Sequence, residues 1–164
     1  MRGLKYVAIF MGILLVISLL LVWYFFTTAS VSIVAYGAKG VPCAEDREAF
    51  EKIKTALNEE TFIGTRFSFE PLGEAEEYAL ITYTVRLSNQ CLVPIDMIEI
   101  QIVPDPTDVA QIGNMAVQSL PAKTQGEFTA TVLVPAGSHS VRQIIVTYYV
   151  WGAGFDVRTT YKDR

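Results

Sequence analysis

Hydrophobic residues follow three successive patterns along the chain. The first is an unbroken run from Tyr6 to Phe26, where 19 of 21 residues are apolar and none is charged. Residues 45–58 then place Phe50, Ile53 and Leu57 on one face of a helix. Beyond this helix, apolar residues recur at every second position, which is the period of a half-buried β-strand. The patterns predict one membrane-spanning helix, one soluble helix and a β domain.

The first apolar run is long enough to cross a bilayer. Its 21 residues rise by about 1.5 Å each and so extend ~31 Å, which matches the thickness of the hydrocarbon core. We therefore predict a transmembrane signal anchor over residues 6–28. Lys5 precedes the run, and Trp23 and Tyr24 close it, which is where interfacial anchors lie.

The distribution of cations predicts the orientation of this helix. Both cations near it stand in residues 1–5, which predicts a cytoplasmic N-terminus and an extracytoplasmic domain over residues 29–164. Two other interpretations stay open. A cleavable signal peptide would end at the small residues 27–29, but its apolar stretch is typically shorter. A type IV prepilin-like leader would carry Glu where this chain has Ala8.

The outer domain reads as a succession of short strands with one apolar face each. Alternation predicts strands at 63–69, 79–87, 98–102, 128–134, 144–150 and 155–161. A further strand is expected at 31–36, broken afterwards by Gly37, Gly40 and Pro42. Residues 109–118 are either an irregular strand or a loop. No crossover helices separate the strands, so we predict an all-β, immunoglobulin-like antiparallel sandwich with the accessory helix at 45–58.

The distribution of charge along the chain limits the classes of protein to which it could belong. All 17 acidic residues and 11 of the 13 basic residues lie beyond the apolar run, so the outer domain carries a net charge of −6. Its apolar content is about 45%, ordinary for a globular domain. These values exclude a polytopic transporter, a disordered protein and a basic nucleic-acid binder.

Two cysteines, Cys43 and Cys91, lie in connections of the outer domain. Under oxidising conditions a disulfide between them would close a loop of about 48 residues and stabilise the fold by roughly 4 kcal/mol. Two free thiols are the alternative. No histidine stands near either cysteine in the sequence, so we expect no metal site there.

Catalytic and cofactor signatures are absent from the sequence. The single histidine, His139, stands in a turn without a nucleophile motif, and the acidic loops lack the pattern of a calcium loop. We therefore expect no enzymatic activity, no catalytic residues, no metal and no cofactor. Alternation instead directs Ile145, Tyr149 and Trp151 to one outer face, where they would form an apolar interaction surface.

Three short motifs of the outer domain form a family pattern: Tyr83-Thr84-Val85-Arg86-Leu87-Ser88-Asn89, then Val93-Pro94-Ile95, then Leu120-Pro121-Ala122-Lys123 before a further strand. On these motifs, residues 78–150 resemble the late embryogenesis abundant type-2 (water-stress) family. It implies a fibronectin-like or immunoglobulin-like sandwich that is often membrane-tethered and lacks catalysis. The helix at 45–58 and the cysteine pair depart from that family pattern.

Together these patterns predict a non-enzymatic, single-pass membrane protein that binds or scaffolds other proteins in a membrane or cell-envelope complex. Its partners are the lipid bilayer, through residues 6–28, and proteins, with no nucleic acid. The alternative is a pilus- or filament-type subunit with a hydrophobic assembly helix. A membrane-tethered hydrolase is the third class, although no polar cluster in the sequence selects it.

Overall fold

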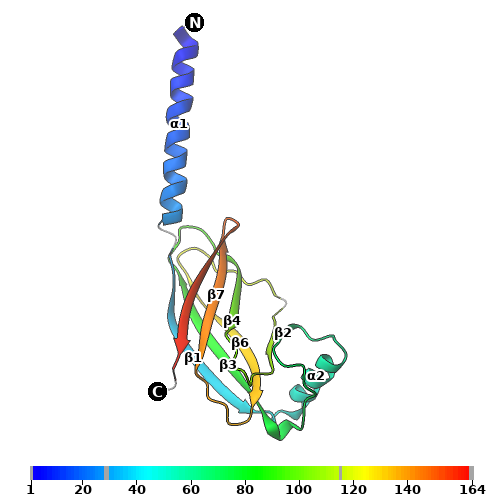
Figure 1. Ribbon diagram of the computed structural model, residues 1–164. Helices are drawn as coiled ribbons and strands as arrows, with labels where there is room; N and C mark the ends of the chain where they lie inside the picture. Colours follow the sequence, from blue (N-terminus) through cyan, green and yellow to red (C-terminus); the bar gives the residue numbers. More distant parts are fainter. Residues whose placement is uncertain (1, 28–29, 115, 163–164) are drawn as a thin grey trace.

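A long helix precedes a domain made of two antiparallel sheets (Figure 1). The computed structural model describes residues 2–27, 30–114 and 116–162. Helix α1 spans Arg2–Thr27, and its segment Lys5–Phe25 is long and apolar enough to cross a membrane, with none of it buried by the rest of the chain. The predicted span is thus present as a helix, while its orientation stays a prediction.

The strands form two sheets of unequal size. The larger sheet has the order β1-β3-β6-β5-β2 and the smaller one the order β4-β7-β8. The larger contains β1 (Val31–Pro42), β3 (Tyr78–Asn89), β6 (Gln125–Pro135), β5 (Ala110–Ile112) and β2 (Gly64–Arg66). The smaller contains β4 (Asp96–Ile102), β7 (Arg142–Val150) and β8 (Ala153–Tyr161). The predicted antiparallel β class is confirmed, whereas its immunoglobulin-like subclass stays a prediction.

Two of the expected strands have different lengths in the structure. Strand β1 continues through Gly37 and Gly40 to Pro42 and pairs with β3 along its length. Proline is tolerated there because β1 is an edge strand whose outer N–H groups need no ladder partner. Strand β2, in contrast, ends at Arg66, and Phe69 is 80% exposed instead of continuing the alternation.

The core lies between the two sheets and follows the predicted alternation. Buried side chains come from the inner faces of both sheets: Ile81, Tyr83, Val85 and Leu87 of β3, Ile98, Ile100 and Ile102 of β4, and Ile144, Val146, Tyr148 and Val150 of β7. Residues 109–118 resolve into the short strand β5 followed by a loop. Strand β5 has three residues, and each of them pairs with a residue of β6.

Helix α2 (Arg47–Asn58) covers the outer face of the larger sheet at the end of the domain far from α1 (Figure 1). The side chain of Asp46 caps its start by accepting a hydrogen bond of 3.1 Å from the Ala49 amide. Phe50 is fully buried and stacks on Tyr78, the first residue of β3, with ring centroids 5.6 Å apart. The predicted helix and its docking stripe are therefore confirmed. The short 3-10 helix η1 (Ala75–Glu77) leads into β3.

A buried ion pair joins the two sheets at the end of the domain far from α1. Arg142, the first residue of β7, donates from Nε and Nη2 to the carboxylate of Asp108 at 2.9 and 2.7 Å. Their side chains are only 2% and 0% exposed. Hydrogen bonding to Asp108 raises the pKa of Arg142 above its ordinary value, so Arg142 stays charged. Asp108 therefore has a structural role in the core.

A buried amide fixes the loops at the end of the domain nearest α1. Asn89, 1% exposed, donates from Nδ2 to the carbonyl oxygens of Val93, Leu120 and Pro121 at 3.0–3.1 Å. Its Oδ1 accepts from the Cys91 amide at 2.9 Å. One side chain therefore satisfies four backbone groups and fixes the two loops that close this end of the core.

We expect the Arg142–Asp108 pair to dominate single-site stability. Asp108→Ala should lower the free energy of unfolding by about 3 kcal/mol, because the buried Arg142 guanidinium loses two hydrogen bonds and its buried counter-charge, and keeps only the half-buried carboxylate of Asp105 at 2.8 Å. Asp156→Ala is the control: it breaks the Arg158–Asp156 pair, whose side chains are 61% and 47% exposed, and should cost below about 1 kcal/mol. Urea unfolding of the full chain in detergent, followed by near-ultraviolet circular dichroism, measures both. Equal losses for the two variants would contradict the prediction.

Candidate functional site

The start of β4 carries an irregularity that exposes an apolar side chain. The pairing of β4 with β7 shifts register between Asp96 and Glu99, and Met97 within this bulge has a φ of 51°. That backbone region is costly for a residue with a side chain, and such strain tends to occur at functional positions. Met97 is 57% exposed as a result.

The free edge of β4 is covered by groups from the other sheet. Gln111 of β5 donates from Nε2 to the Ile100 carbonyl at 2.7 Å, and its Oε1 accepts from the Ile102 amide at 2.9 Å. Further along the edge, the Ile98 amide donates to the Gln118 carbonyl at 3.0 Å. The Gln111 side chain therefore takes the place of a neighbouring strand and ties the sheets together at this edge.

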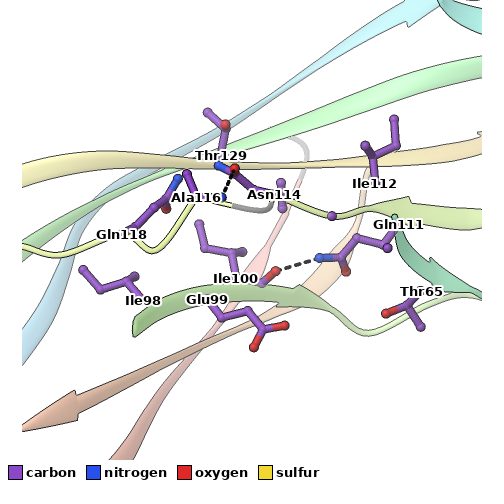
Figure 2. A pocket seen from close by; sticks show the side chains of 13 residues that line it. Thr65, Ile98, Glu99, Ile100, Gln111, Ile112, Asn114, Ala116, Gln118 and Thr129 are labelled. Carbon is purple, nitrogen blue, oxygen red and sulfur yellow. Dashed lines mark hydrogen bonds between the residues drawn. The ribbon is translucent and has the colours of Figure 1, made fainter. Parts of the chain in front are cut away.

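Between these two contacts lies a cleft of about 250 Å³, seen from close by in Figure 2. Backbone and side chains of β4 form one wall, and the other comes from β5, the loop after it and β6. Its polar side chains are Thr65, Glu99, Gln111, Asn114, Gln118 and Thr129. Asn114 shapes the loop by accepting from the Ala116 amide at 2.9 Å. The cleft thus offers amide and hydroxyl groups suited to hydrogen bonding.

An apolar ledge adjoins the cleft. A second hollow of about 200 Å³ shares Ile98, Glu99, Asn114, Ala116 and Gln118 with it and adds Met97 and Val117. Val117 is 78% exposed. We call the cleft and the ledge together the β4 groove, formed by residues 97–100, 111–114 and 116–118 with Thr65 and Thr129. Sequence reasoning missed it, because the bulge at Met97 leaves no signal in the alternation of β4.

Two residues of the predicted surface, Ile145 and Tyr149, are half-buried on the outer face of the smaller sheet, where Ile145 is flanked in register by Gln101 and Arg158. Strand β7 ends at Val150, so the third residue, Trp151, lies in the β7–β8 turn. That the three residues form an interaction surface stays a prediction.

Trp151 lies beside the C-terminal end of α1. Its ring meets that of Phe25 edge to face, with centroids 5.7 Å apart. The predicted interfacial residues Trp23 and Tyr24 lie in the same last turns of α1 and are 67% and 53% exposed, while Lys5 stands at the other end of the apolar segment. Their places on the helix match the prediction, and their contact with a membrane stays a prediction.

The expected disulfide is not formed. Cys43 and Cys91 are both free and buried. The Cys43 amide bonds the carbonyl of Tyr78 at the start of β3, whereas Cys91 lies just beyond Asn89 at the end of that strand. Twelve strand residues at about 3.3 Å each put the thiols at opposite ends of the sheet, far beyond the ~6 Å between Cα atoms that a disulfide allows.

His139 is exposed, and its ring contacts both Asp105 and Arg142. Its Nε2 lies 3.2 Å from the carboxylate of Asp105, and its Nδ1 lies 3.0 Å from Arg142 Nη1. Among the described residues, no group of three or more His, Cys, Asp and Glu side chains is placed to hold a metal ion.

Comparison with known proteins identifies no family. No family model matches the chain, and no curated protein matches it. Among solved structures, it is similar to the cupredoxin domain of amoB from Nitrosocaldus yellowstonii, at 15% sequence identity and a TM-score of 0.34. The match covers 79% of this chain and 88% of that chain. We infer nothing about function from a likeness this distant, and the resemblance to the late embryogenesis abundant type-2 family stays a prediction.

We expect both thiols to be unreactive in the folded protein. Burial raises the pKa of Cys43 to about 11 and also raises that of Cys91, which keeps both out of the reactive thiolate form at neutral pH. Maleimide should label neither cysteine in mild detergent and both in urea, as counted by intact mass. Phe69→Cys, at an 80% exposed position, is the positive control and should label at once. A mass gain on reduction of the untreated protein would contradict the separation of the two thiols.

Proposed function

We propose that the protein is a non-enzymatic, single-pass membrane protein whose outer β domain binds another protein of a membrane or cell-envelope complex through the β4 groove. The observation that carries this proposal is the pair of exposed apolar side chains, Met97 and Val117, beside a hydrogen-bonding cleft. An apolar centre next to polar groups is the usual composition of a protein interface.

The details of the groove favour a protein segment as the ligand. Met97 has a flexible, polarisable side chain that adapts to irregular partner surfaces. Gln118 and Asn114 present amide groups that pair with backbone as readily as with side chains.

The polar groups of the domain support a binding role over catalysis. Glu99 is the single ionisable side chain among the described residues that line the cleft, so no acid–base pair is assembled there. The most buried charges, Arg142 and Asp108, pair with each other at the opposite end of the domain, where Arg142 also pairs with Asp105. Stability is sufficient to explain the arrangement of these two buried charges.

The membrane helix explains how such a domain would meet its partner. Helix α1 ends at Thr27 and β1 begins at Val31, so the connection is too short to let the domain move far from the bilayer. Anchoring raises the effective concentration of the groove for other proteins of the same membrane. On this proposal the cations Arg2 and Lys5 keep the N-terminus cytoplasmic and the domain outside.

Charged substitutions on the ledge should abolish partner binding. Val117→Glu and Met97→Glu each place a carboxylate where the partner's apolar surface would bury it, and we expect roughly a tenfold or greater loss of the bound protein. The measurement is isolation of the full chain in mild detergent, with quantitative mass spectrometry of the proteins that remain bound. Both positions are exposed, so neither change should unfold the domain.

Phe69→Glu is the matched control, because Phe69 is 80% exposed but lies outside the groove. Proteins retained by the wild type and this control but lost from both ledge variants would support the proposal. A partner-free, monodisperse monomer would contradict it, as would retention by both ledge variants. Loss of the first few residues with helix-dependent polymerisation would favour a filament subunit instead.

A further inference from the structure

The β7–β8 turn exposes a bulky residue in a conformation that does not suit it. Trp151 and Gly152 form this two-residue turn with φ values of 49° and 79°. Asn-Gly is the usual choice for such a turn, because both positions require a positive φ. Tryptophan at the first position is costly, and it leaves the side chain 56% exposed. Local turn chemistry therefore does not explain why tryptophan stands there.

The position of this turn relative to α1 suggests an explanation. Trp151 contacts Phe25, which is the last residue of the segment long enough to span a membrane. A span of about 31 Å fills the hydrocarbon core, so its outer end lies at the membrane interface. The edge-to-face contact at 5.7 Å then places the Trp151 ring at the same depth.

A second exposed apolar residue lies at the same end of the domain. Leu92, in the β3–β4 loop, is 56% exposed. Its neighbour Gln90 donates its amide to the carbonyl of Ser30, just beyond the end of α1, at 3.0 Å. The β3–β4 loop and the β7–β8 turn both lie at the end of the domain that faces α1 (Figure 1).

We propose that the β7–β8 turn, led by Trp151, inserts into the outer interface of the bilayer that α1 spans. The indole ring favours this depth, because its apolar body enters the acyl region while its N–H stays hydrated. The contact would be a second attachment point that fixes the orientation of the domain. Its driving force is apolar, since a domain with a net charge of −6 is not attracted to anionic lipid. This inference rests on the membrane anchoring that is part of the proposed function.

Depth-dependent fluorescence quenching tests the inference, because the chain has two tryptophans. Trp23→Phe leaves Trp151 as the sole tryptophan, and Trp151→Phe leaves Trp23. The full-length variants are reconstituted in phosphatidylcholine vesicles whose acyl chains are brominated either near the headgroup or near the methyl end. We expect Trp151 to lose fluorescence chiefly with bromine near the headgroup, to an extent similar to that of Trp23.

A variant with both tryptophans replaced and Phe69→Trp added is the control. Phe69 is 80% exposed, and the adjacent Ser68 and Glu70 line a hollow with Pro135 at the membrane-distal end of β6, so this tryptophan should show no quenching. Quenching of Trp23 without quenching of Trp151 would overturn the inference and leave the anchor intact. Stronger quenching of Trp151 by bromine near the methyl end would also overturn it. Absence of quenching at both tryptophans would instead overturn the membrane anchoring of the proposed function.

Discussion

The buried ion pair between Arg142 and Asp108 is the contact on which the sandwich depends at the end far from α1. Each charge would be costly to bury alone, so the start of β7 and the loop before β5 have to stay together for either to remain in the core. Tyr83 packs beside them and donates its hydroxyl to the Ser140 carbonyl at 2.9 Å, and burial raises the pKa of Tyr83 to about 12. A desolvated polar cluster of this kind specifies one arrangement of the two sheets, because few other arrangements satisfy all of its groups.

Polar side chains close the sandwich elsewhere as well, and each acts from one sheet or loop on another. Asn89 fixes two loops at the membrane-proximal end, and Gln111 joins β5 to the edge of β4. The protein achieves this without a disulfide, so its core is held by hydrophobic burial and by buried hydrogen bonds. Irregular backbone lies mainly at the periphery of this sandwich, as in the bulge at Met97 and the turn at Trp151, where φ is positive. The fold tolerates backbone strain at these two positions because the paired strands around them hold them in place.

Alternation in the sequence was enough to predict β3, β4, β6, β7 and β8, because each strand has one face in the core and one outside. The alternation did not predict features that depend on contacts between distant parts of the chain. A proline usually ends a strand, but Pro42 is tolerated in β1 because β1 lies at a sheet edge. The partner of Arg142 and the separation of Cys43 from Cys91 depend on which end of the domain each loop occupies, and spacing along the chain does not encode that. The β4 groove could not be predicted for a related reason: it is built from a bulge, a strand edge and a loop that are distant in sequence.

The geometry of the anchor also bears on what the groove can reach. Strand β4 starts at the end of the domain nearest α1, so Met97 lies on the membrane side of the groove and Gln111 on the distal side (Figure 1). A domain held both by α1 and by Trp151 would have little freedom to turn this edge away from the bilayer. A partner that approaches along the membrane would then meet the apolar ledge before the polar cleft. On the proposed anchoring, the order of these two surfaces would favour a juxtamembrane segment of another membrane protein over a soluble ligand, because such a segment leaves the bilayer with apolar residues first and exposes backbone polar groups beyond them.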